Sequence, residues 1–185
     1  MKVSMNLLKR YADIPVTPSE YQSRMIMTGT GVEGIDDLSK QLENVVVGRV
    51  LTCVPHENSD HLHVCTVDVG SSEPLQIVCG APNVRQGMKV ALALAPAKVP
   101  GAEITETAIA GFKSEGMCCS GKELGISDDH SGILELKTSA PNGTDLKEIY
   151  PIEDIIFEVD NKSLTNRPDL WGHYGIAREF AALTG

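Results

Sequence analysis

Apolar residues in the middle of the chain, from 40 to 151, fall in short runs that glycine, proline and polar residues interrupt. The run at 62–69 partly alternates between apolar and polar positions, a pattern typical of a half-buried strand. Several short strands separated by such turns indicate a small barrel or sandwich. Strands are predicted at 45–51, 62–69, 75–79 and 90–94.

The beginning of the chain shows helical signals instead. Residues 17–20 form a capping box with Pro18 at the first helical position. The helix that follows is expected to place three side chains on one face, those of Tyr21, Met25 and Ile26. Ser4 is expected to cap a shorter helix with apolar positions at Leu7, Leu8 and Tyr11. A short strand is predicted at 32–35.

The last part of the chain combines a strand with a helix. Residues 155–159 are apolar enough for a strand, and Asn166 is expected to cap a helix with Pro168 in its first turn. Helical spacing then connects Leu170, Tyr174, Ala177 and Ala181. Segments as short as 1–39 and 152–185 bury little surface alone. We therefore expect them to pack on each other as one small discontinuous α+β domain, into which a second domain, 40–151, is inserted.

The composition indicates the cellular compartment of the protein. The sequence is 42% hydrophobic but only 4% aromatic, so the cores are expected to be mostly aliphatic. No apolar run approaches the roughly 20 residues that span a bilayer, and the first residues do not resemble a signal peptide. The five cysteines are odd in number, which favours reduced thiols over a disulfide framework. We expect a soluble cytoplasmic protein without membrane contact.

The charge argues against a self-sufficient nucleic-acid binder. The formal net charge is −9, whereas such binders usually carry a basic surplus. Residues 40–151 contain nine basic and fourteen acidic residues, a balance of −5. Their only aromatic residues are Phe112 and Tyr150, which is a poor supply for stacking bases. Any RNA contact is expected to be local and based on shape.

One cluster of histidine and cysteine invites a metal hypothesis. Imidazole and thiolate are good zinc ligands, but the spacing matches neither CxxC nor HxxxH. A metal- or redox-active enzyme would rest on this cluster alone. We interpret it as a polar turn that leads into a strand, and we expect no zinc at His56, His61, His63 and Cys65.

Two other groups of reactive residues have structural explanations. Cys118 and Cys119 are adjacent, and adjacent cysteines are badly aimed for a disulfide. Residues 128–131 (Asp-Asp-His-Ser) are immediate neighbours, whereas catalytic triads are assembled across a fold. We expect a loop there, in which Asp128 or Asp129 accepts hydrogen bonds from nearby backbone. No catalytic residue is predicted.

Several runs together resemble the bacterial phenylalanine–tRNA ligase β-subunit family. Residues 46–50 leading into 55–62, then 76–84, 114–120 and 122–125, resemble its tRNA-binding OB module. The same runs in the same order also occur in standalone tRNA-binding proteins. The flanks favour the ligase family, because they resemble the segments before and after its OB module: residues 1–4, 8–11, 166–169 and 175–179.

The resemblance implies an α+β chain in which a five-stranded OB-fold barrel is inserted into a small α+β domain formed by both chain ends. It implies the N-terminal part of the β subunit of an α2β2 enzyme, which attaches phenylalanine to its tRNA with ATP and magnesium. The α subunit would carry the catalytic site, and the editing site would lie beyond residue 185. This part would then be non-catalytic and would hold no cofactor. The alternative is a standalone OB-fold tRNA-binding or chaperone-like protein.

The expected partners are the α subunit and tRNA, with no DNA. OB folds bind nucleic acid across the second and third strands and the adjoining loops. The residues expected to make local contacts with tRNA are Arg49, Asn58, Lys113, Ser114, Met117, Ser120 and Lys122. No metal ligand is among them.

Overall fold

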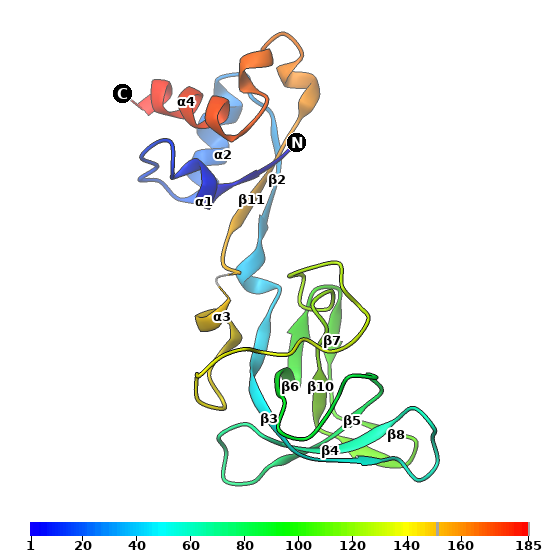
Figure 1. The fold of residues 1–185 in the computed structure, drawn as a ribbon. Helices are drawn as coiled ribbons and strands as arrows, with labels where there is room; N and C mark the ends of the chain where they lie inside the picture. Colours follow the sequence, from blue (N-terminus) through cyan, green and yellow to red (C-terminus); the bar gives the residue numbers. More distant parts are fainter. Residues whose placement is uncertain (151, 185) are drawn as a thin grey trace. The chain divides into compact units, whose positions relative to one another are not determined.

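The computed structural model describes residues 1–150 and 152–184. The chain divides into two compact units. The first joins Met1–Ser39 to Glu153–Gly185, and the second is Lys40–Ile152. In Figure 1 the blue N-terminal and orange-to-red C-terminal segments come together in the first unit, and the green and yellow middle forms the second. The expected boundary at residue 151 and the expected last residue, 185, lie outside the described residues.

The first unit is built on a small antiparallel sheet in the order β1-β11-β2. Its strands are β1 (Lys2–Ser4), β2 (Val32–Asp37) and β11 (Ile155–Val159), so the central strand comes from the far end of the chain. Two helices precede β2 and three helical segments follow β11. They are α1 (Met5–Leu8), α2 (Pro18–Met27), the 3-10 turns η2 (Asn161–Leu164) and η3 (Pro168–Leu170), and α4 (His173–Thr184).

Both predicted N-caps of the opening helices are confirmed. The Ser4 hydroxyl accepts from the Leu7 amide at 3.1 Å, and the Thr17 hydroxyl accepts from the Glu20 amide at 3.3 Å. The buried faces differ in detail from the expectation. Tyr21 and Met25 are buried on α2, but Ile26 is exposed. On α1 the buried residues are Met5 and Leu8, because a helix of one turn presents only one narrow face to the core; Leu7 and Tyr11 are exposed.

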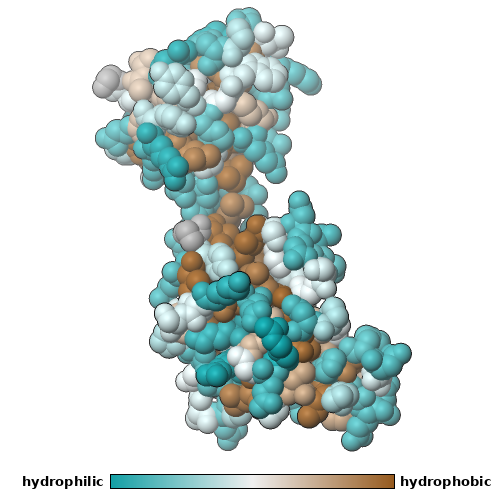
Figure 2. All heavy atoms as spheres, in the orientation of Figure 1, coloured by the Kyte–Doolittle hydropathy of each residue, from teal (hydrophilic) through white to brown (hydrophobic). Residues whose placement is uncertain are grey.

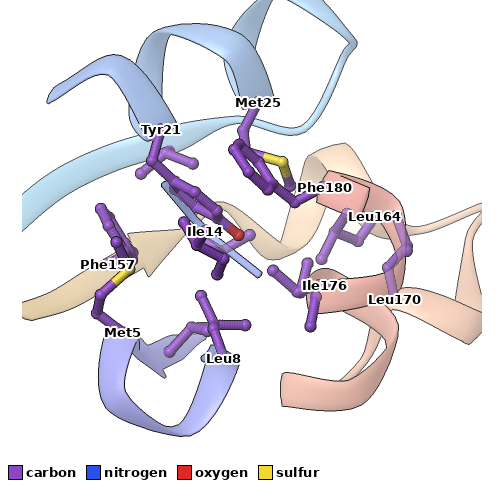
Figure 3. Close-up of a cluster of buried hydrophobic side chains, with 14 residues drawn as sticks. Met5, Leu8, Ile14, Tyr21, Met25, Phe157, Leu164, Leu170, Ile176 and Phe180 are labelled. Carbon is purple, nitrogen blue, oxygen red and sulfur yellow. The ribbon is translucent and has the colours of Figure 1, made fainter. Parts of the chain in front are cut away.

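The core of the first unit draws on both chain ends. Tyr21 of α2 stacks on Phe157 of β11 and on Phe180 of α4, with ring centroids 4.6 and 4.4 Å apart. Leu8 and Met25 lie in the same buried cluster as Ala177. Figure 3 shows side chains from α1, α2, β11 and α4 converging around the Tyr21 ring. Three aromatic rings and the aliphatic residues around them thus connect segments more than a hundred residues apart.

The prediction for the last helix was wrong in its start and in its buried face. Asn166 is not the cap; residues 168–170 form the separate 3-10 turn η3, and α4 begins at His173. Gly172 adopts φ +135°, which separates the two segments. The buried residues of α4 are Gly175, Ile176, Ala177 and Phe180, whereas Tyr174 and Ala181 are exposed. The apolar spacing that starts at Leu170 crosses a break in the helix, so it does not define one face.

The second unit contains a curled antiparallel sheet of six strands, in the order β10-β6-β3-β4-β5 with β7 paired to β6. Its strands are β3 (Glu43–Pro55), β4 (His63–Asp68), β5 (Leu75–Cys79), β6 (Lys89–Val99), β7 (Ala102–Ile104) and β10 (Gly116–Cys118). The four strands predicted in this region are confirmed, and β3 and β6 are longer than predicted. Further elements of this unit are the hairpin β8 (Thr107–Ile109) and β9 (Phe112–Ser114), and α3 (Leu146–Ile149). The 3-10 turn η1 (Leu38–Lys40) crosses the boundary between the two units.

Curling brings the segment before β10 alongside β5. The Glu115 amide donates to the Gln76 carbonyl at 3.0 Å, and the Val78 amide donates to the Ser114 hydroxyl at 3.1 Å. Gly48 allows the neighbouring strands to approach, because a β carbon there would lie 2.7 Å from Val67 Cγ1. The chain is therefore α+β, with a half-barrel sheet in its middle.

The interior of this sheet is aliphatic and contains thiols. Two buried clusters are formed mainly by valine, leucine, isoleucine and alanine, and all five cysteines are free. Figure 2 shows hydrophilic residues over most of the visible face of each unit, with hydrophobic residues between them. Among the described residues, no helix has the length and apolarity needed to cross a membrane.

Candidate nucleic-acid interface

Arg49 lies on β3, between its two neighbouring strands. Its backbone is paired with Asp68 on β4 and Lys89 on β6, and its side chain is exposed. The pKa of Asp68 is lowered, chiefly because the Gly70 amide donates to its carboxylate, and the Arg49 charge contributes. Among the described residues no carboxylate forms an ion pair with Arg49. Its guanidinium is thus available to an external anion.

Asn58 occupies the tight turn between β3 and β4, which a buried histidine holds. The His56 amide donates to the Leu62 carbonyl at 2.9 Å, and His56 Nδ1 accepts from the Asn58 amide at 3.0 Å. The imidazole packs edge-on against Phe112 of β9, with centroids 4.7 Å apart. The side chain of Asn58 is exposed at the tip of this fixed turn.

Lys122 lies in the turn that follows β10. Ser120 and Glu123 close this turn reciprocally: the Ser120 amide donates to the Glu123 carboxylate at 2.7 Å, and the Glu123 amide donates to the Ser120 hydroxyl at 3.2 Å. The Lys122 amide donates to the Asp129 carbonyl at 3.0 Å. The Lys122 side chain is exposed and has no ion pair among the described residues. Ser120 is buried and serves the turn.

Lys113 is exposed on β9, but its charge is already paired. Its ammonium lies 3.0 Å from Glu106 and 3.2 Å from Glu115. Hydrogen bonds to these two carboxylates raise the pKa of Lys113. The Glu115 carboxylate also accepts from the Gln76 amide, which is the largest cause of its lowered pKa. An approaching phosphate would have to compete with two carboxylates for this ammonium.

Ser114 and Met117 lie in the interior of the fold more than on its surface. Ser114 is 1% exposed, and its hydroxyl accepts from the Val78 amide and donates to the Gly116 carbonyl at 2.9 Å. Met117 is half-buried on β10, where its backbone is paired with Ala93. Ser114 thus connects this segment to β5 where the sheet curls, whereas Met117 belongs to the pairing of β10 with β6.

Three other basic side chains in the second unit are engaged internally. Arg85 pairs with Glu135 at 2.6 Å, and Lys98 pairs with Glu43 at 2.9 Å. The Lys89 ammonium donates to two backbone carbonyls at 2.6 and 3.3 Å. Within the described part of the chain, these contacts leave Arg49 and Lys122 among the cations that no carboxylate neutralises. Among the described residues, no hydrogen bond or ion pair joins Arg49, Asn58 and Lys122 to one another.

A cavity of about 230 Å³ lies beside Met117 and Ser120. The Ser120 hydroxyl lies 2.7 Å from Glu123 and 3.2 Å from His130 Nδ1. This order differs from a catalytic triad, in which the acid orients the imidazole and the imidazole takes the proton of the hydroxyl. Here the carboxylate contacts the hydroxyl directly. The hydrogen bonds among these three side chains therefore hold the turn in place.

The histidine and cysteine cluster is dispersed by the fold. His56 is buried under the turn, His61 is exposed and hydrogen-bonded to Asp60 at 3.1 Å, and Cys65 is buried in the sheet interior. His63 lies on β4 with Cys65. Within residues 1–150 and 152–184, no three His, Cys, Asp or Glu side chains are placed to share a metal ion.

The loop expected at 128–131 is confirmed. The Asp129 carboxylate accepts from the amide and the hydroxyl of Ser131 at 2.9 and 2.7 Å, and the backbone hydrogen bond is the largest cause of its lowered pKa. The sequence did not indicate the β8–β9 hairpin, whose Phe112 supports the β3–β4 turn. A signal was available, because Gly111 separates two short β-like runs.

Comparison with known proteins identifies a domain family and several relatives that are similar to this chain. Residues 45–145 match the family described as "Putative tRNA binding domain". The chain is 44% identical over its full length to the phenylalanine–tRNA ligase beta subunit of Nitrosospira multiformis, and 43% identical over 98% of its length to that of Bacteroides thetaiotaomicron. It spans 23% of the length of each relative. The C-terminal domain of Plasmodium vivax p43 is a distant structural likeness, with TM-score 0.42 and 21% identity over 56% of this chain and 58% of that one.

Proposed function

The chain belongs to this family of tRNA-binding domains, and we propose that it is the tRNA-binding and structural N-terminal part of a phenylalanine–tRNA ligase β subunit. The observation that carries the proposal is the similarity to such subunits along the whole chain, at 44% identity, and not only across the matched domain at 45–145. A standalone tRNA-binding protein would share the middle alone. The flanks that form the first unit therefore favour the ligase over the standalone alternative.

The enzyme we propose as the parent acts in the cytoplasm and attaches phenylalanine to tRNA with ATP and magnesium. In it this part would support an α2β2 assembly with the α subunit and would perform no chemistry. Reading the gene beyond codon 185 separates the two candidates: several hundred further codons support the ligase, and an immediate stop supports the standalone binder.

We propose that the curled sheet of the second unit is an OB-type module inserted into the small domain that both chain ends build. The antiparallel order β10-β6-β3-β4-β5 and the contact between the β10 segment and β5 support a barrel-like closure. OB modules bind across their central strands and the loops beside them. Arg49 on β3 and Asn58 in the β3–β4 turn lie on those elements.

The residues expected to contact tRNA differ in whether their polar groups are exposed and free of ion pairs. Arg49, Asn58 and Lys122 present exposed polar groups, and we propose that they touch RNA directly. Lys113 would contribute only by exchanging a carboxylate for a phosphate. The side chains of Ser114, Ser120 and Met117 would instead hold the neighbouring strands and turns in place without touching RNA. This division predicts different variant effects for the exposed and the buried groups.

The affinity of this part alone is expected to be low. Residues 40–151 carry a balance of −5, which repels the RNA polyanion at long range. Two or three phosphate contacts give an affinity near the non-specific range, about 10⁻⁴ to 10⁻⁶ M. In a longer enzyme, other domains would hold the tRNA and raise its effective concentration at this surface.

The test is a salt titration of tRNA binding to the chain, with a phenylalanine tRNA and an unrelated tRNA. Each phosphate contact contributes roughly 0.7–0.9 to the slope of log affinity against log salt. Arg49→Ala and Lys122→Ala should each lower the slope by about that amount. Lys98→Ala is the matched control, because it removes one positive charge from an ion pair with Glu43 without removing a proposed contact.

Three results would contradict the proposal. Equal losses in the Lys98→Ala control would show that only net charge matters. A steep slope that survives both variants would place the binding face elsewhere. Submicromolar affinity at physiological salt would move the standalone binder ahead.

A further inference from the structure

A pair of thiols lies in the wall of the cavity beside Met117 and Ser120. Cys79 ends β5 and Cys118 ends β10, two strands that are far apart in the sheet order but meet where the sheet curls. Both thiols line the cavity of about 230 Å³, and each shifts the pKa of the other. We propose that Cys79 and Cys118 form a peroxide-sensitive site that oxidises to a disulfide across the seam of the sheet.

The fold makes Cys79 the nucleophile of the pair. Its sulfur accepts a hydrogen bond from the Cys118 thiol and another from the Ala81 amide, and these two donors lower the pKa of Cys79 to about 7, against burial and the nearby Glu123 charge. Cys118 is the donor, so its own pKa is raised well above the usual value. The thiolate is the reactive form of cysteine, and donors of this kind are what distinguish reactive thiols from inert buried ones.

The cavity gives a small oxidant access to this thiolate. Its other walls include Gly80, Pro82, His130 and Ser131, all of which are exposed, so the space connects with solvent. One water molecule takes about 30 Å³ in the liquid, and the cavity therefore has room for a molecule the size of hydrogen peroxide. Neither Cys79 nor Cys118 is more than 6% exposed, which keeps larger disulfide reagents away.

The reaction balances in two steps. The Cys79 thiolate attacks one peroxide oxygen; a sulfur–oxygen bond forms, the oxygen–oxygen bond breaks, hydroxide leaves and takes up the proton that Cys79 released on ionising, and Cys79 becomes a sulfenic acid. The Cys118 sulfur then attacks the Cys79 sulfur. The sulfur–sulfur bond forms, the sulfur–oxygen bond breaks, and the departing oxygen leaves as water with the proton of Cys118. Two thiols are oxidised to one disulfide, and one peroxide is reduced to two waters.

The other thiols are not equivalent to this pair. Cys53 and Cys65 are cross-strand partners on β3 and β4, but burial and the Cys53 hydrogen bond raise the pKa of Cys65 far above the usual range. Cys53 donates to the Val84 carbonyl at 3.9 Å. Cys119 is fully buried, donates to the Met117 carbonyl at 3.5 Å, and has its pKa raised by burial to about 12. Cys65 and Cys119 therefore hold their protons, and Cys53 is not part of the cavity wall.

The experiment treats the purified, reduced chain with hydrogen peroxide at neutral pH and maps its cysteines by mass spectrometry. The wild type should lose two hydrogens in intact mass, its free thiols should fall from five to three, and a peptide joining residues 79 and 118 should appear. In Cys118→Ala, which also removes one donor to the Cys79 sulfur, Cys79 should react more slowly and stop at a sulfenic acid that a cyclic diketone traps. Cys79→Ala should form neither product, and Cys119→Ala is the matched control that should behave as the wild type.

Other outcomes would overturn the proposal. These are five free thiols after treatment, a link between residues 53 and 65 or between 118 and 119, or oxidation of Cys79 to a sulfinic acid without any link. The wild-type peptide map decides among them even if an alanine variant fails to fold. Thermal unfolding of each variant identifies such a failure.

Discussion

Replacing Tyr21 with phenylalanine should stabilise the first unit. The Tyr21 side chain is 1% exposed, and its hydroxyl has no hydrogen-bond partner among the described residues. The ring stacks on Phe157 and Phe180 at 4.6 and 4.4 Å. A phenylalanine ring keeps these contacts and removes only the unpaired polar atom.

The magnitude follows from the cost of burying a hydroxyl without a partner. That cost is about 1–3 kcal/mol, and the hydroxyl is the only group that the substitution removes. We expect Tyr21→Phe to raise the free energy of unfolding by about 1 kcal/mol. In a domain of roughly 60–100 residues, a change of this size raises Tm by about 4–8 °C.

The effect should also depend on pH. Burial raises the pKa of Tyr21 far above its ordinary value of 10.0, so the folded state holds the phenolic proton more tightly than the unfolded state. The wild type should therefore lose stability as the pH rises above about 10, where the unfolded tyrosine ionises. Tyr21→Phe has no such proton, and its advantage should widen in that range.

Urea unfolding followed by tryptophan fluorescence measures this change. Trp171 is the only tryptophan, and its indole donates to the Leu164 carbonyl at 3.2 Å, so its signal reports on the first unit. Tyr11→Phe is the matched control, because Tyr11 is 57% exposed and its substitution should change stability little. A loss of 1 kcal/mol or more in Tyr21→Phe would show that the hydroxyl has a stabilising partner and would refute the reasoning.

Three further changes test other parts of the chain. Gly175→Ala should destabilise the first unit by about 3 kcal/mol in urea unfolding, because a β carbon there collides with the Asp169 carbonyl oxygen; an unchanged midpoint would contradict this. Thr17→Ala should cost about 1 kcal/mol, since it removes the acceptor for the Glu20 amide, and Thr17→Ser should restore it. Protein purified without a histidine tag and dialysed should contain no stoichiometric zinc by metal analysis; bound zinc would require a rearrangement of His56, His61, His63 and Cys65.

Local signals in the sequence identified the elements whose neighbours in space are also their neighbours in the chain. The capping box at 17–20 predicted the start of α2, and the apolar run at 75–79 predicted β5 with its observed limits. A cap needs one side chain and a backbone amide three residues away. A buried strand needs a short apolar run. Both conditions are visible in the sequence.

Local signals failed where tertiary contacts, and not the spacing of apolar residues, decide which side chains are buried. The apolar positions from Leu170 onward suggested one helix, but Gly172 interrupts it and Gly175 is buried against the Asp169 backbone. The close approach of that backbone decides which face of α4 is buried. A one-dimensional pattern contains no information about such an approach.

The candidate interface was likewise predicted only in part. The sequence identified Arg49, Asn58 and Lys122 as polar residues on the appropriate strand and turns, and these side chains are exposed. It did not distinguish them from Lys113, which two carboxylates neutralise, or from Ser114, whose hydroxyl is used within the sheet. Glu115, the second carboxylate beside Lys113, also accepts from the amide of Gln76, a residue distant in sequence.

The sequence alone determined the short elements, the excess of acidic residues and the motifs that resemble a tRNA-binding module. Only the tertiary structure decided which cations remain unpaired and which thiols meet. Cys118 has Cys119 beside it in the chain, yet the thiol that shares its cavity is Cys79 on another strand. The physical reason is that ion pairs and thiol contacts depend on distances of a few ångströms, and curling of the sheet sets those distances between segments that the sequence separates.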